Sequence, residues 1–162
     1  MILFEKATRD DIEKLTELRI AYLTEDNGRL DSAELALLKQ NLPDYFMRNL
    51  NRNIFCYAAR QGQEIVACAF LLVIEKPMSP AFITGKTGTV MNVYTKPEYR
   101  HCGYARKLME MLLADAAEQN LSVVELKATE DGYPLYISLG FEDVKSKYHS
   151  MKINPVQKEQ FL

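Results

Sequence analysis

The chain has 162 residues, of which 48% are hydrophobic and 26% charged, a composition typical of a folded globular protein and not of a disordered chain. This length predicts one domain over residues 1–162. The 20 basic and 22 acidic residues give a net charge of −2, which argues against a general nucleic-acid-binding protein. Three cysteines are too few for a disulfide framework, and the longest apolar run, Ile65 to Ile74, is too short to span a membrane. We therefore expect a cytoplasmic protein.

Hydrophobic spacing predicts a strand and two helices at the start of the chain. Ile2–Lys6 is rich in strand-forming residues, and Thr8 is a candidate N-cap for the helix that follows it. Apolar residues recur at helical spacing after Thr8, and this helix is expected to stop before Thr24. A second helix begins at Ser32. Pro43 is expected to interrupt the second helix and bend it.

The middle of the chain favours a hairpin, a loop, a strand and a helix. Ile54–Arg60 and Glu64–Glu75 are rich in strand formers, and the short connection with a glycine between them predicts an antiparallel pair. Two prolines and two glycines in residues 77–88 indicate an exposed loop. Thr89–Tyr94 is the next predicted strand. The apolar residues of Ala105–Ala116 then follow helical spacing over about four turns.

The remaining elements indicate an α/β (α+β) protein. A strand is predicted at Leu121–Ala128, and a short helix at Tyr133–Leu139, closed by Gly140. Two final strands are expected at Phe141–Val144 and Tyr148–Ile153. Helices, a hairpin, a β-α-β-α unit and a terminal strand pair together predict a sheet packed against helices.

The residues between the strand at Thr89–Tyr94 and the following helix form a candidate anion site. They read Arg100-His101-Cys102-Gly103-Tyr104-Ala105. Backbone N–H groups at a helix start have no acceptor within the helix, and the helix dipole leaves partial positive charge there, so the loop could hold a pyrophosphate. Gly103 would let the backbone approach the anion closely, while Arg100 and Arg106 add positive charge. A glycine at such a junction is, however, more often only a turn residue.

Two motifs in the second half of the chain resemble those of the GCN5-related N-acetyltransferase (GNAT) superfamily. The run from Val93 to Ala105 contains the R-x-x-G-x-A form of the family's loop motif. Leu135-Tyr136 and Leu139-Gly140-Phe141 resemble its later L-Y-x-x-x-G-F signature. The resemblance extends from about Gly88 to Phe141. It implies an acyl-CoA N-acyltransferase-like fold: a mixed, twisted, mostly antiparallel sheet with a central, splayed pair of parallel strands and helices on both faces.

The resemblance also implies that acetyl-CoA is the donor substrate and that no metal is needed. It assigns the pyrophosphate to the backbone of residues 101–106, and the pantetheine arm to main-chain groups of the preceding strand, as in strand addition. A further contact is implied at Thr129 or Glu130, the position where many relatives carry an asparagine. The residues implied in acetyl-CoA binding are Val93, Tyr94, Thr95, Arg100, His101, Cys102, Gly103, Tyr104, Ala105, Arg106 and Thr129.

Two residues are candidates for catalysis. Tyr136 occupies the position of the family's frequent general acid, and its phenol is suited to protonating a departing thiolate; it could equally be a packed tyrosine. Glu125 resembles the catalytic glutamate of some relatives, although on a strand it could also face solvent. Thr89 stands where other relatives carry a glutamate. Cys102, at a helix start beside two basic residues, is an alternative nucleophile or simply a backbone donor.

These observations predict an acetyltransferase that moves an acetyl group from acetyl-CoA directly to a primary amine of a small molecule, peptide or protein. The missing glutamate at Thr89 leaves an alternative, a non-catalytic acyl-CoA-binding or regulatory module with the same fold. Acceptor choice is expected to depend on the first two helices, including Arg19 and Tyr22. Neither nucleic acid nor a membrane is an expected partner. Many such enzymes dimerise, and Phe161 and Leu162 are candidates for packing on a second copy.

Overall fold

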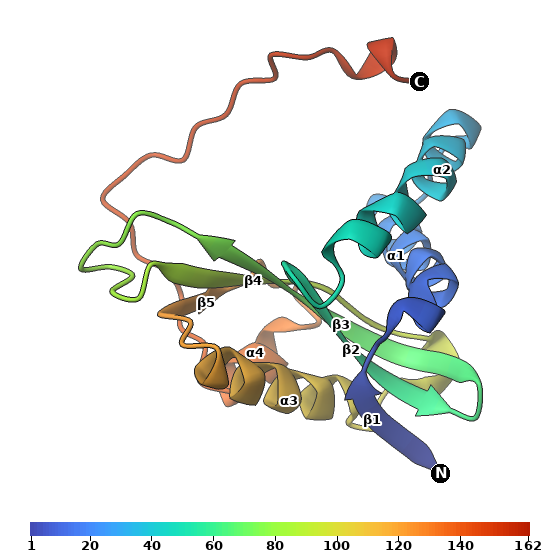
Figure 1. Ribbon diagram of the computed structural model, residues 1–162, viewed down its shortest axis with the longest axis horizontal. Coiled ribbons are helices and arrows are strands. Elements are labelled where there is room, and N and C mark those ends of the chain that lie inside the picture. The colour runs from blue at the N-terminus through green and yellow to red at the C-terminus, as the bar shows by residue number, and fades with distance from the viewer.

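A five-stranded sheet with helices on both faces makes up the body of the computed structural model, which describes residues 1–162 (Figure 1). The strands are β1 (Ile2–Lys6), β2 (Ile54–Gln61), β3 (Glu64–Glu75), β4 (Lys86–Thr95) and β5 (Val123–Glu125). The helices are α1 (Ile12–Asn27), α2 (Ser32–Asn49), α3 (Tyr104–Glu118) and α4 (Tyr133–Ser138). Three short 3-10 turns, η1 (Arg9–Asp11), η2 (Pro97–Tyr99) and η3 (Lys158–Gln160), complete the structure.

The sheet is mixed, as the sequence predicts. Its strands lie in the order β1-β2-β3-β4-β5, with antiparallel pairing from β1 to β4 and a parallel β4–β5 pair. The parallel pair is short, since only Thr87–Thr89 of β4 is in register with β5. From there β4 continues to Thr95 with β3 as its one strand neighbour. The two parallel strands are therefore splayed.

Alternation along β2 sends its side chains into two separate hydrophobic cores. Cys56 and Ala58 belong to a cluster that includes residues of α1 and α2. Tyr57 and Ala59 belong to the opposite cluster, which includes α3 and Tyr136 of α4. Figure 1 shows the corresponding layers, with α1 and α2 on one side of the sheet and α3 and α4 on the other. Burial on both faces fixes the register of the central strands.

The first two helices differ from the prediction at the residues where the sequence indicates an end or a bend. α1 continues to Asn27 instead of stopping before Thr24. The Thr24 hydroxyl and the Asn27 amide donate to helix carbonyls one turn back, at 2.8 Å each. Pro43 lies within an unbroken α2. The proline costs the helix one hydrogen bond, but the next turn is anchored by Phe46, which is buried in the core.

Strand boundaries also differ near the parallel pair. β4 begins at Lys86, so its first residues come from the segment predicted to be a loop. β5 covers only Val123–Glu125, not Leu121–Ala128. A strand at the edge of the order has one neighbour, and its ladder ends where β4 turns away. The expected hairpin and the helices beginning at Ser32, Tyr104 and Tyr133 are confirmed.

The two strands predicted at Phe141–Val144 and Tyr148–Ile153 do not form, and that prediction was wrong. No backbone N–H in residues 142–157 donates to another backbone carbonyl. The segment runs apart from the body of the protein, and the chain returns toward α2 at its end (Figure 1). There Lys158 pairs with Glu34 of α2, and Phe161 and Leu162 line a groove with Leu38. None of the helices combines the length and the apolar composition that a membrane-spanning helix needs.

Candidate functional site

The free edge of β4 forms one wall of the candidate site. Beyond Thr89, this edge has no strand partner on the β5 side. The strand also bulges here: its register with β3 shifts between Cys68 and Phe70, and Asn92 adopts a positive φ of 56°. Backbone donors and acceptors along the free edge are thus open to an extended ligand, as in strand addition.

The loop that follows β4 supplies a row of unused backbone donors. In residues 101–106 no N–H group donates to an acceptor in the protein. On either side of this row, the Arg100 N–H donates to the Pro97 carbonyl and the Lys107 N–H donates to the Gly103 carbonyl. Gly103 caps α3 with φ +78°, a conformation that favours glycine. A Cβ at Gly103 would meet nothing within 4 Å, so the requirement is conformational and not spatial. Free N–H groups at a helix N-terminus are suited to an anion.

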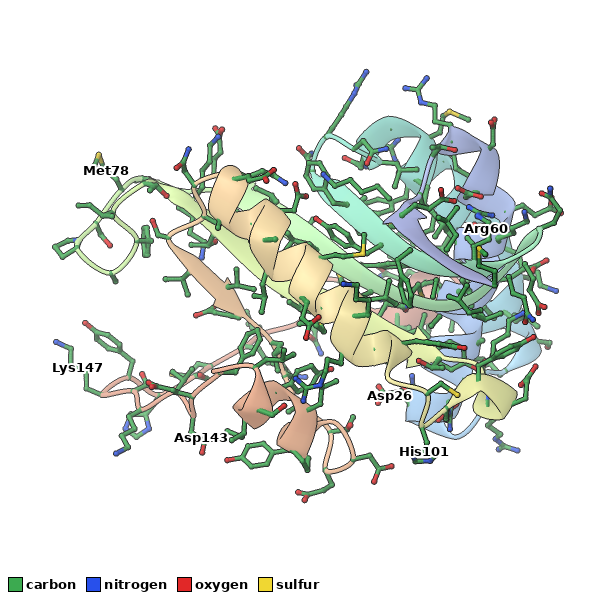
Figure 2. All side chains as sticks on the ribbon, turned by 90° about the horizontal axis from the view of Figure 1, so that it is seen from below. Asp26, Arg60, Met78, His101, Asp143 and Lys147 are labelled. Atoms are coloured by element: carbon green, nitrogen blue, oxygen red, sulfur yellow. The ribbon has the colours of Figure 1, made fainter.

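Arg100 fastens this loop to its surroundings. Its Nε donates to the Thr95 carbonyl at 2.9 Å, and its Nη2 donates to both carboxylate oxygens of Glu25 at 2.9 and 2.7 Å. The hydrogen bond with Glu25 raises the pKa of Arg100 above its usual value. Figure 2 shows the end of α1, marked by Asp26, beside the loop that carries His101. The guanidinium therefore orders the loop, and the free donors of the site are backbone N–H groups.

Tyr136 of α4 is held at the same end of the sheet. Its ring stacks edge-to-face on Phe141 at 5.9 Å and lies against Gly132, where a Cβ would come within 3.0 Å of the ring. The side chain is buried, yet its hydroxyl makes no hydrogen bond in the protein and keeps contact with solvent. Burial raises the pKa of Tyr136, and the phenol of Tyr22 raises it further. The group is a neutral O–H donor with no protein acceptor.

Glu125 and Tyr136 line one groove of about 660 Å³ beside β5. The rest of this groove is mostly apolar and is built from α3, β5, α4 and the segment after α4. Glu125 is the register partner of Thr89, so its backbone stands next to the position where the family's other glutamate would be. It is exposed and makes no ion pair. Both residues thus border the same groove.

A model of the acetyltransferase (GNAT) family matches residues 12–141 of the chain. The chain belongs to the GNAT acetyltransferase family. Among solved structures, a predicted acetyltransferase from Clostridium acetobutylicum with acetyl-CoA is 29% identical, with 94% of this chain and 96% of that chain covered and a TM-score of 0.81. A GCN5-related N-acetyltransferase from Ralstonia eutropha is 28% identical, with 94% and 99% covered and a TM-score of 0.78. A search of curated proteins returned no match.

The shared fold does not define the acceptor of this GNAT protein. A ribosomal-protein-alanine N-acetyltransferase from Brucella melitensis aligns with 95% of this chain and 99% of its own at a TM-score of 0.64, but is only 19% identical. That likeness shows the fold alone. An aminoglycoside acetyltransferase and a glucosamine-6-phosphate N-acetyltransferase share this fold as well, so the residues around the site have to be considered one by one.

The structure brings most of the predicted acetyl-CoA residues together around the β4–α3 junction of the GNAT domain. Val93, Tyr94 and Thr95 lie on the splayed part of β4, and residues 100–106 form the loop and helix start. Arg106 reaches α4, where it donates to the Ser138 hydroxyl at 2.5 Å. Thr129 has a structural contact: its hydroxyl accepts the Gly132 N–H at 3.1 Å, and its carbonyl accepts the Tyr133 N–H at 2.9 Å.

Sequence reasoning missed Asn92. This residue is buried, donates from its amide to the Cys68 sulfur at 3.5 Å, and accepts from Arg19 at 3.2 Å. An asparagine within a predicted strand is a usable signal, because asparagine is disfavoured in strands but tolerates positive φ at a bulge. Cys102, the alternative nucleophile, is exposed, and its thiol points to the Arg100 carbonyl at 3.5 Å.

Proposed function

We propose that this protein transfers the acetyl group of acetyl-CoA directly to a primary amine, with Tyr136 as general acid. The observation that carries the proposal is the row of unpartnered N–H groups at residues 101–106, next to the free edge of β4. The free N–H groups and the free strand edge together fit two parts of a single long ligand. The anion site suits a pyrophosphate, and the strand edge suits an extended amide-containing arm.

Each part of acetyl-CoA has residues suited to it. The diphosphate would accept hydrogen bonds from backbone N–H groups of His101 to Arg106, with the Arg106 side chain as a nearby positive charge. Main-chain groups of Val93, Tyr94 and Thr95 would hold the pantetheine arm along β4. Thr129 is proposed to contact the coenzyme from the loop before α4. In this arrangement the donor is held mainly by backbone atoms, so side-chain truncations there should have small effects.

The reaction needs a base, an electrophile and an acid. The neutral amine attacks the thioester carbonyl carbon, the C–N bond forms, and the C–S bond breaks. A backbone N–H of the β4 edge would stabilise the carbonyl oxygen as it gains charge. The sulfur leaves with the electron pair and takes the Tyr136 proton, while the extra proton of the amine passes to Glu125 directly or through water. Tyr136 then regains a proton from solvent.

Glu125 supports catalysis over a purely binding role. The alternative of a non-catalytic module rests on Thr89, which lacks a carboxylate. The register places Glu125 directly beside Thr89, on the neighbouring strand, and it lines the groove that holds Tyr136. A carboxylate is therefore available in the same region from another strand. Glu125→Gln should lower turnover while acetyl-CoA binding stays unchanged, because the substitution removes the base and keeps the shape.

Two measurements test the proposal. Isothermal titration of acetyl-CoA into the protein should show binding that is lost on competition with free CoA. A thiol-release assay over amino acids, polyamines, aminoglycosides, amino sugars and peptides should then identify acceptors. Absence of acetyl-CoA binding at high micromolar concentration would overturn the proposal. Binding with no transfer to any amine would favour the non-catalytic module instead.

A further inference from the structure

Arg19 of α1 points toward the bulge of β4 and is half-buried. Its Nη1 donates to Oδ1 of Asn92 at 3.2 Å, and its guanidinium lies over the Tyr22 ring at 5.8 Å from the centroid. The Asn92 amide is itself fixed, because its nitrogen donates to the Cys68 sulfur. Arg19 is thus held in one place by neutral groups.

No carboxylate of the protein forms an ion pair with Arg19. Burial lowers the pKa of Arg19, and the charge of Asp26 raises it against that effect. Arg60 is a useful comparison, since it also lies against the body of the protein and pairs with both Glu5 and Asp11, at 2.7 and 2.9 Å. Arg100 pairs with Glu25 in the same way. Arg19 has a single hydrogen bond, to a neutral amide, so most of its five N–H groups are unused. A half-buried charge without a counter-ion is costly, and a bound anion would remove that cost.

Arg19 also lies near the reacting end of the proposed site. Asn92 follows shortly after Thr89, where β4 and β5 separate, and directly precedes the β4 residues proposed to hold the pantetheine arm. Tyr22 lies one helical turn after Arg19, and its phenol is close enough to Tyr136 to raise the pKa of that residue. Tyr22 comes from the α1 side of the sheet and Tyr136 from the α4 side. Arg19 and the general acid thus approach the splay from opposite faces.

We propose that Arg19 binds an oxyanion group of the acceptor, so that the acceptor is an amine that also carries a carboxylate or a phosphate. This rests on the proposed acetyltransferase function. The planar guanidinium can bind either anion through two parallel hydrogen bonds while it keeps its bond to Asn92. Such an anchor would hold the amine on the α1 side of the thioester, with Tyr136 on the other side for the leaving sulfur.

The test compares matched acceptors that differ only in the anion. The standard L-amino acids are compared with their C-terminal amides, and phosphoethanolamine with ethanolamine, in the thiol-release assay. The wild-type protein should prefer the anionic member of at least one pair by about 10- to 100-fold in kcat/KM, the range for a charge-assisted hydrogen bond. Arg19→Gln, which keeps a donor toward Asn92, should abolish that preference mainly through KM. Arg19→Lys should restore part of the preference for the anionic acceptor. Arg29→Gln, on an exposed loop, is the matched control and should keep the full preference.

The outcomes separate this inference from the proposed function. If the wild type acetylates acids and amides equally well, or if Arg19→Gln keeps the preference, the inference is overturned and the acetyltransferase stands. If acetyl-CoA binds but no amine reacts, titration of the same acids into the acetyl-CoA complex decides. Binding that Arg19→Gln alone abolishes would support the anion site and overturn the proposed catalysis; no binding to the wild type would overturn both. Acetyl-CoA titration of each variant checks that the fold is intact.

Discussion

At the scale of single residues, the site depends on groups that the fold keeps unpartnered. The N–H groups of residues 101–106 lack acceptors because they belong to a loop and a first helical turn. The Tyr136 hydroxyl lacks one because the ring is fixed against Gly132 and Phe141 while its oxygen faces outward. These donors are solvated in the free protein, so a ligand can accept from them without breaking a hydrogen bond of the protein.

Tyr136→Phe tests the general acid. The change should lower kcat by about 100-fold, the usual contribution of a positioned proton donor, with the acetyl-CoA dissociation constant unchanged because the ring still packs on Phe141. Burial raises the Tyr136 pKa, so the wild-type phenol keeps its proton where the acceptor amine loses its own. The wild-type rate should therefore show no alkaline decline below about pH 10. Stopped assays of thiol release across pH measure the loss of kcat in the variant and the pH dependence of the wild type. Unchanged turnover in the variant would exclude Tyr136 as the general acid.

Gly103→Ala tests the anion loop. Its φ of +78° disfavours any residue with a Cβ, at a cost of about 1–2 kcal/mol, which in a chain of this size is a fall of several degrees in Tm. The new methyl meets no protein atom, but it stands beside the free N–H groups. Acetyl-CoA affinity should therefore fall by at least 10-fold, more than the loss of stability explains. Gly62→Ala, which has φ +58° in the β2–β3 turn, is a control for strain alone and should keep its affinity.

At the scale of elements, α3 is tied to the sheet by one carboxylate. Asp115 accepts hydrogen bonds from Lys6 of β1 at 2.7 Å, from the Tyr57 hydroxyl of β2 and from Gln119. Burial alone would raise the pKa of Asp115, but the hydrogen bonds from Lys6 and Tyr57 outweigh burial and hold it below its usual value. This contact holds the last turn of α3 against the sheet, in addition to the packing of its buried apolar residues.

Asp115→Asn should reduce the free energy of unfolding at pH 7 by about 1–3 kcal/mol, since it weakens a charge-assisted network. A carboxylate with a lowered folded-state pKa contributes stability that is present above its unfolded pKa, about 3.9, and is lost as pH falls through the folded value. The difference between wild type and variant should accordingly shrink below about pH 4. Urea unfolding of both proteins at pH 7 and below about pH 4 measures this difference in the free energy of unfolding. A difference that does not change with pH would show that Asp115 acts through shape alone.

Most elements could be predicted from local patterns, and the errors have a common cause. The hairpin and the helices from Ser32, Tyr104 and Tyr133 have strong periodicity and clear start signals. Pro43 and Thr24 are unfavourable in a helix, yet both lie inside helices because tertiary packing outweighs local propensity. The extent of β5 depends on how far β4 stays beside it, which no local pattern records.

At the scale of the whole molecule, the segment after α4 stands apart from the sheet. It carries large apolar side chains that are exposed, among them Val144 at 81%, Met151 at 92% and Ile153 at 86%. Figure 2 shows Asp143 and Lys147 on this segment, away from Arg60 of the central sheet. Because this segment pairs with no strand, its exposed apolar side chains are not covered within one copy of the chain.

Hydrogen exchange checks this arrangement. Amides of residues 142–157 should exchange at nearly unprotected rates, because they have no backbone acceptors, whereas those of β3, hydrogen-bonded on both sides, should be the most protected. Measurement at low and high protein concentration separates two outcomes. Protection that appears only at high concentration would indicate that the segment pairs with a second copy, whereas protection at all concentrations would contradict the structure.

The sequence by itself determined the family and predicted the donor loop and the general acid, because these depend on short motifs whose residues lie close together along the chain. R-x-x-G-x-A, placed between a predicted strand and a predicted helix, indicates a helix start whose first N–H groups have no acceptor within the helix. Only the tertiary structure decided that Arg100 binds Glu25, that Glu125 stands beside Thr89, and that Arg19 has no counter-ion. These facts join residues far apart in the chain, and only packing of the helices on the sheet sets which charges meet.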